Sequence, residues 1–145
     1  MGVAYRTGAV RVRSSPREPA LRKARVCYDH LAGELGVLAL DSLEHSRYVR
    51  RDADGLTFTR AGKRFFAEIG IDFETLASQR RRLSRTCLDW SERRHHLAGA
   101  AGAALLDRCY ELGWARCAKD SRVVTFSPAG ERAFRLRFRV AESSS

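Results

Sequence analysis

Apolar residues recur at helical spacing through much of the first half of the chain and alternate with polar ones in two short segments. Residues 20–32 place Leu21, Ala24, Tyr28 and Leu31 on one stripe, which predicts a helix that Pro19 opens. Turn residues at 52–55 separate two strand-like segments and predict a β-hairpin. In order, the pattern predicts helices over 20–32 and 35–46, strands over 48–51 and 56–59, and helices over 60–68 (with Thr59 as N-cap) and 72–82.

The second half of the chain shows the same order of elements. Residues 92–112 carry an apolar stripe that predicts one long helix, which Gly113 ends. Segments 114–118 and 123–126 are predicted to form a second hairpin. Ser127 followed by Pro128 is typical of a helix start, because proline fits the first helical position. The sequence therefore predicts a second helix–hairpin–helix unit.

An internal repeat is the strongest signal in this sequence. The run HLAG at residues 30–33 recurs at 96–99, and the copies match at nine positions over residues 30–55 and at six over 56–66. Their offset is 66 residues before the hairpin and 68 after it, so the added pair falls in the turn. Duplication of one supersecondary unit is the simplest cause. We expect an α+β, mainly helical fold of two tandem winged-helix-like (helix–β-hairpin–helix) repeats, packed together around pseudo-twofold symmetry.

The repeat also sets the expected division of the chain. Residues 1–19 contain glycine, proline and arginine without a sustained hydrophobic period, and they are predicted to form an irregular basic lead-in. The first repeat is expected over residues 20–82 and the second over 83–140. The polar tail at 141–145 is predicted to be disordered.

The charge of the chain points to a polyanionic partner. It has 27 Lys and Arg against 17 Asp and Glu, a formal net charge of +10, and nucleic acid is the first partner that such a charge suggests. Basic runs between the two halves are candidates for contact with DNA phosphates, although a solvated helix face is the usual explanation of such runs. The candidates are Arg80, Arg81, Arg82, Arg85, Arg93 and Arg94.

No apolar run approaches the roughly 20 residues that a membrane span needs, so no membrane contact is expected. The N-terminus lacks the apolar core of a signal peptide, and we expect a cytoplasmic protein. Its four cysteines are then expected to be reduced thiols.

Soft metal ligands recur before both HLAG runs. Cys27 and His30 have the spacing Cys-x-x-His, and further ligands for a thiophilic metal or metalloid are Cys87, Asp89, His95 and His96. The spacing is not that of a zinc finger, since the chain has no Cys-x-x-Cys pair. The interpretation we favour at this point is that these are small core cysteines and structural histidines, so no cofactor is expected. The recurrence of Cys-x-Asp keeps the metal site as the alternative.

No catalytic motif is present. The chain lacks Gly-x-Ser-x-Gly, a phosphate-binding loop and His-Glu-x-x-His, and it is not expected to be an enzyme. A small thiol-dependent enzyme is the remaining enzymatic alternative, with Cys87 and His96 as nucleophile and base.

Several of these runs together resemble one family. Residues 16–25 (PREPALRKAR) and 27–33 (CYDHLAG), with 87–94 (CLDWSERR) and the second HLAG run, are similar to the region after the DNA-binding head of ArsR-type helix-turn-helix regulators. In that family a winged helix precedes this region, and the residues before Pro16 are too few to hold one. The resemblance implies a transcription-regulator module that provides homodimerisation or effector sensing, with non-specific DNA contact. The alternative is a metal- or metalloid-sensing remnant that does not bind DNA.

Overall fold

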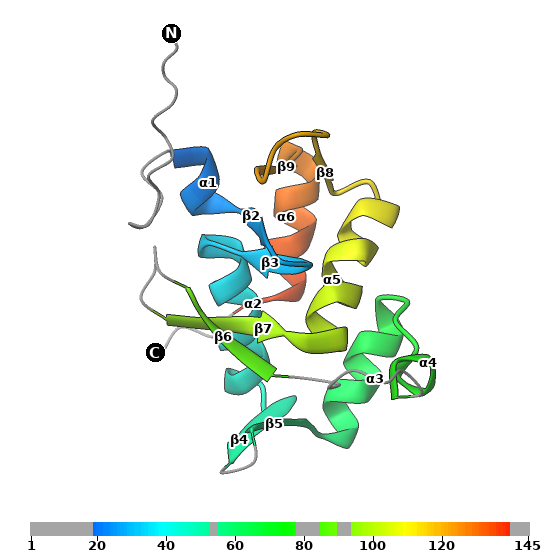
Figure 1. Cartoon of the computed structure of the whole chain (residues 1–145). Coiled ribbons are helices and arrows are strands. Elements are labelled where there is room, and N and C mark those ends of the chain that lie inside the picture. The colour runs from blue at the N-terminus through cyan, green and yellow to red at the C-terminus, as the bar shows by residue number, and fades with distance from the viewer. Residues whose placement is uncertain (1–18, 53–54, 78–84, 90–93, 140–145) are drawn as a thin grey trace, which may run out of the picture.

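A computed structural model describes residues 19–52, 55–77, 85–89 and 94–139 (Figure 1). Its elements in chain order are α1 (Pro19–Lys23), β2 (Arg25–Cys27), β3 (His30–Ala32), α2 (Glu34–His45), β4 (Val49–Asp52), β5 (Gly55–Phe58), α3 (Arg60–Glu68), α4 (Phe73–Ala77), β6 (Arg85–Asp89), β7 (Arg94–Ala98), α5 (Gly99–Glu111), β8 (Ala115–Cys117), β9 (Val124–Phe126) and α6 (Pro128–Arg137). The order hairpin, helix, hairpin, helix thus occurs twice. That each copy is a winged-helix-like domain stays a prediction.

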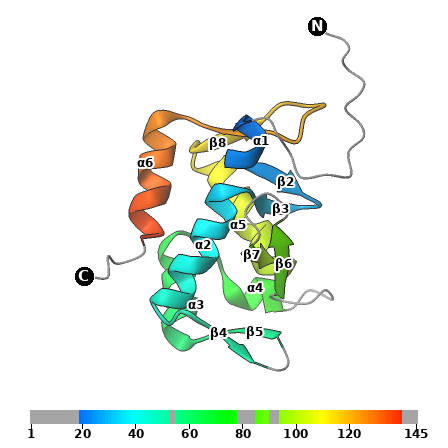
Figure 2. The same ribbon diagram turned by 90° about the vertical axis from the view of Figure 1, so that its left-hand side faces the viewer.

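The four hairpins of the described chain are separate antiparallel pairs. The inner hairpins, β2–β3 and β6–β7, lie side by side, and their strands β3 and β7 are in contact. The outer hairpins, β4–β5 and β8–β9, lie at opposite ends of the molecule in both views (Figures 1 and 2). The inner hairpins are therefore the place where the two copies meet.

The long helix of each copy, α2 or α5, packs against one strand of the inner hairpin of the other copy. Helix α2 contacts β7, and α5 contacts β3. A Cβ atom at Gly36 of α2 would lie 3.4 Å from the Cβ of His96, and one at Gly102 of α5 would lie 3.2 Å from the Cβ of His30. The two glycines hold equivalent places in the repeat, so the contact is made twice in the same way. It places an imidazole of each copy beside the helix of the other.

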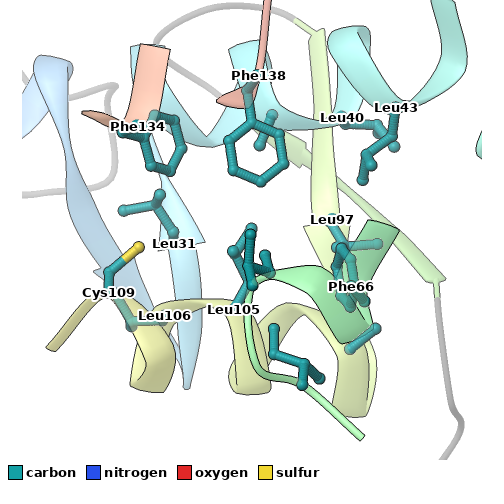
Figure 3. Packing of buried hydrophobic residues seen from close by; sticks show 14 of the residues in the cluster. Leu31, Leu40, Leu43, Phe66, Leu97, Leu105, Leu106, Cys109, Phe134 and Phe138 are labelled. Atoms are coloured by element: carbon teal, nitrogen blue, oxygen red, sulfur yellow. The ribbon is translucent and has the colours of Figure 1, made fainter. Parts of the chain in front are cut away.

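The hydrophobic core runs through both copies (Figure 3). Leu35, Leu40 and Leu43 of α2 are fully buried, as are Phe66 of α3 and Phe134 of α6. Each such side chain contributes about 1.5–3 kcal/mol when it leaves water. One continuous core therefore fixes the positions of the inner hairpins.

Helices α3 and α6 confirm the predicted helix starts at Thr59 and Ser127. Helix α3 has the predicted bounds, and the Gly62 N–H donates to Thr59 Oγ1 at 3.1 Å. The Gly130 N–H donates in the same way to Ser127 Oγ at 2.9 Å, so Ser127 caps α6. Helix α2 and the outer strands lie within two residues of their predicted bounds. The predicted helix over 72–82 is observed as Phe73–Ala77, and residues 78–82 lie outside the described part.

The prediction of a helix over residues 20–32 was wrong. The helix α1 ends at Lys23, and the hairpin β2–β3 follows. Its first strand is held by a distant segment, because the Val26 N–H donates to the Arg122 carbonyl at 2.8 Å and the Val124 N–H donates to the Ala24 carbonyl at 3.1 Å. The helical stripe in the sequence was thus overridden by long-range pairing.

The prediction of one helix over residues 92–112 was also wrong at its start. Strand β7 occupies Arg94–Ala98, pairs with the unpredicted strand β6, and α5 begins at Gly99. Gly99 has φ +77° and the equivalent Gly33 has φ +85°, a backbone region that favours glycine. A Cβ at Gly33 would also lie 2.8 Å from the Arg22 carbonyl oxygen. The HLAG run is therefore the end of a strand followed by a sharp turn into a helix.

The described helices are all short, the longest being α5 with 13 residues. None of them has the length and apolar character that crossing a membrane requires. The lead-in before Pro19 and the tail at 141–145 lie outside the described residues.

Candidate metal centre

Each inner hairpin supplies one cysteine and one histidine at a matched position. In β2–β3, Cys27 lies opposite His30, and in β6–β7, Cys87 lies opposite His96. Directly opposed residues of an antiparallel pair project from the same face of the sheet. Both members of each pair therefore project from the same face of their hairpin.

The four side chains converge on one point between the hairpins. The Nε2 atoms of His30 and His96 are 3.0 Å apart, and the Sγ atoms of Cys27 and Cys87 are 4.0 Å apart. All four candidate ligand atoms lie within 4.8 Å of one another. His30 and His96 are buried and the two cysteines are half-buried. Four of the six residues named as candidate metal ligands are thus brought together.

The turn of the first hairpin positions one of the imidazoles. Tyr28 has φ +60° and is 89% exposed, so its ring points to solvent. The next residue, Asp29, has its Oδ1 atom 3.3 Å from Nδ1 of His30. When an ion binds, a carboxylate beside Nδ1 favours the proton on that nitrogen, so that Nε2 can present its lone pair to the ion. Sequence reasoning missed Asp29 in this role, although its place directly before His30 was a usable signal.

The histidines change the acidity of the neighbouring thiol. Hydrogen bonds from His30 and His96 to the thiolate lower the pKa of Cys27 to about 5, against the opposing effect of burial. At neutral pH Cys27 is therefore a thiolate, the form that binds metals. Burial raises the pKa of Cys109 to about 12, so that thiol is inert. Cys117 lies elsewhere and donates to the Ser121 carbonyl oxygen at 3.1 Å.

The remaining predicted site residues are not placed at this centre. Asp89 ends β6, but its side chain lies outside the described part. His95 is the neighbour of His96 in β7, and its Nδ1 atom lies 3.3 Å from Nη1 of Arg51. Of the arginines predicted to contact phosphate, Arg80, Arg81, Arg82 and Arg93 lie outside the described residues, and Arg85 and Arg94 are described only in their backbone. Phosphate contact by these six residues stays a prediction.

A basic helix face that sequence reasoning missed lies on α3. Arg60, Lys63 and Arg64 are exposed, and their spacing of three and four residues places them on one side of the helix. Phe65 and Phe66, on the opposite side, are buried in the core. The signal was present in the sequence as a basic triplet within the predicted helix at 60–68.

Comparison with known proteins gives one relative. The chain is 38% identical over 129 residues to a protein of Bacillus subtilis (strain 168) with the name "Uncharacterized HTH-type transcriptional regulator YdfF". The matched region covers 89% of this chain and 57% of that protein. No family model matches the chain. No solved structure matches it either. The chain is therefore similar, over most of its length, to little more than half of a protein named as a transcriptional regulator.

Proposed function

We propose that this chain is the effector-sensing module of a transcriptional regulator, and that its effector is a thiophilic metal or metalloid ion. The relative named as a regulator supports the general role, and the ArsR-like sequence runs support the sensing half of such a protein. The observation that carries the proposal is the convergence of Cys27, His30, Cys87 and His96 between the two inner hairpins.

The placement of these ligands suits sensing. An ion shifts a conformational equilibrium only by the difference between its affinities for the two states. Here each hairpin holds half of the ligands, so an ion binds tightly only when the hairpins are together. Binding would thus favour one arrangement of the two copies, which share a core with α2 and α5. A change at the centre would pass to the outer hairpins through these helices.

Uptake of the ion by the whole chain tests the proposal. The reduced, metal-free protein is incubated without oxygen with Zn(II), Cu(I) or arsenite, desalted and assayed for bound ion. We expect one ion per chain, lost in the double variant Cys27→Ser, Cys87→Ser and kept in Cys117→Ser. Hydrogen exchange at β2–β3 and β6–β7 should slow on binding. Equal uptake by the double variant, or no change in exchange, would contradict a sensing role.

DNA contact is the second part of the proposed function, and homodimerisation stays an expectation from the ArsR resemblance. The net charge of +10 and the basic face of α3 support contact with phosphates. Anisotropy of a labelled duplex at increasing salt tests it, because each phosphate contact contributes about −0.9 to the slope of log affinity against log salt. Replacing Arg60, Lys63 and Arg64 by glutamine should flatten the slope, and replacing Arg80, Arg81 and Arg82 tests the predicted run. No binding at low salt would leave a sensing module without DNA contact.

A further inference from the structure

Two of the separations between donor atoms of the cluster are close to those of a tetrahedral zinc site. For zinc, bond lengths of about 2.3 Å to sulfur and 2.05 Å to nitrogen place two sulfurs about 3.8 Å apart and two nitrogens about 3.3 Å apart around a tetrahedral ion. The observed separations are 4.0 Å between the sulfurs and 3.0 Å between the nitrogens. These two separations therefore differ from the tetrahedral values by only a few tenths of an ångström, and all four ligand atoms lie within 4.8 Å of one another.

The number and kind of ligands also restrict the ion. Two thiolates neutralise a divalent charge in this largely buried place, and tetrahedral sets of two sulfurs and two nitrogens are typical of zinc. A trivalent metalloid would be best held by three thiolates. The cluster offers Cys27 and Cys87, whereas Cys109 is buried elsewhere and Cys117 is bound to the turn of β8–β9. A monovalent copper ion would gain less from the two imidazoles, because it prefers soft sulfur ligands.

The surroundings keep the four ligands in place. Asp29 lies at Nδ1 of His30, on the side away from the centre. Gly102 and Gly36 allow α5 and α2 to close on His30 and His96, whose exposed fractions are 5% and 0%. Four protein ligands in a buried place leave no open position on the ion, and closed sites of this type are structural or regulatory rather than catalytic.

We infer that Cys27, His30, Cys87 and His96 together bind one divalent ion of the zinc class in a closed tetrahedral site, with one Cys–His pair from each copy of the repeat. The inference rests on the proposed function and narrows its effector from thiophilic ions in general to this class. The bound ion links the two copies through four protein ligands, and water does not coordinate it.

Cobalt(II) titration of the reduced whole chain tests the geometry. A tetrahedral Co(II) site gives intense visible bands because it has no centre of symmetry, together with thiolate charge-transfer absorption. We expect both at one equivalent of Co(II), and their loss when one equivalent of Zn(II) is added. The variants His30→Gln and His96→Gln should lose the tetrahedral bands. The matched variant His45→Gln, at an exposed histidine that ends α2, should keep them.

X-ray absorption at the zinc edge provides a readout that needs no variant to fold. The expected first shell is two sulfurs at about 2.3 Å and two nitrogens at about 2.0–2.1 Å. A pale six-coordinate cobalt spectrum, or a zinc shell without imidazole, would overturn the inference. Uptake of Cu(I) or arsenite without uptake of Zn(II) or Co(II) would overturn it while leaving the proposed function in place. Uptake of none of these ions would overturn both.

Discussion

The Nε2 atoms of His30 and His96 lie 3.0 Å apart although 66 residues separate the two histidines in the chain. Two ring nitrogens at this distance form a hydrogen bond only when one carries a proton and the other offers its lone pair. Without an ion, a proton therefore links the two copies of the repeat where the ion would bind.

Ion binding should move this proton from Nε2 to Nδ1 of the imidazole that carries it, because a metal-bound histidine stays neutral and both Nε2 lone pairs must point at the metal. We expect Zn(II) affinity to fall as the pH is lowered towards about 5, since protons then compete with the ion for the Cys27 thiolate. Cys27 has a pKa of about 5 and is already a thiolate at neutral pH, so protons compete with the ion for its sulfur only near pH 5. Nitrogen-15 NMR of the imidazoles shows which ring nitrogen carries the proton with and without the ion. A proton that stays on Nε2 of either histidine after Zn(II) binding would contradict this prediction.

The low pKa of Cys27 also predicts selective alkylation of the metal-free chain. The reactive thiolate persists down to about pH 5, so the alkylation rate should rise with pH around that value and then level off. Cys109, with a pKa of about 12, should stay unlabelled in the folded protein. Mass spectrometry after timed iodoacetamide treatment resolves the sites. Slow labelling of all four thiols at the same rate would contradict this prediction and would also exclude the thiol-dependent enzyme.

The parts of the fold that local chemistry specifies were predictable from the sequence. Thr59 and Ser127 cap their helices within three residues, so α3 and the start of α6 follow from short motifs. The inner hairpins were not predictable in this way. Strand β2 depends on hydrogen bonds to Arg122 and Val124 in the other copy, and a helical stripe at 20–32 concealed it.

The candidate site, too, was predictable only as far as local patterns specify it. Residue type and the recurrence before each HLAG run were enough to single out Cys27, His30, Cys87 and His96. Their convergence needs the side-by-side packing of β3 and β7, which no local pattern contains. The sequence therefore favoured isolated core cysteines and histidines, whereas the structure shows one cluster.

Removing the carboxylate beside His30 should weaken ion binding without unfolding the chain. Partners of metal-bound histidines typically contribute 10–100-fold to affinity, so Asp29→Asn should raise the Kd for Zn(II) by about that factor. Competition with a chromophoric chelator measures the change. Asp120→Asn, at an exposed aspartate in the turn of β8–β9, is the matched control and should bind as the unaltered chain does. An unchanged Kd in Asp29→Asn would show that Asp29 does not position His30.

Replacing the equivalent glycines Gly36 and Gly102 by alanine tests packing against helix propensity, because the two effects change the free energy of unfolding in opposite directions. Gly36 and Gly102 lie inside helices, where alanine normally adds about 1 kcal/mol of stability. A Cβ at Gly36 would instead lie 2.5 Å from the Leu31 carbonyl oxygen, and one at Gly102 would lie 2.6 Å from that of Leu97. Helix and strand must then separate, and overpacking of this kind costs up to about 3 kcal/mol.

We therefore expect Gly36→Ala and Gly102→Ala each to lower the free energy of unfolding in urea. Each should also weaken Zn(II) binding, because His96 and His30 lie directly against these two glycines. Gly113→Ala is the control: nothing lies within 4 Å of the added Cβ, and its φ of +75° costs about 1 kcal/mol. That variant should keep its ion affinity, because Gly113 follows the end of α5 and lies outside the cluster. A stabilising effect of Gly36→Ala would mean that α2 does not press on the strand and imidazole as the structure shows.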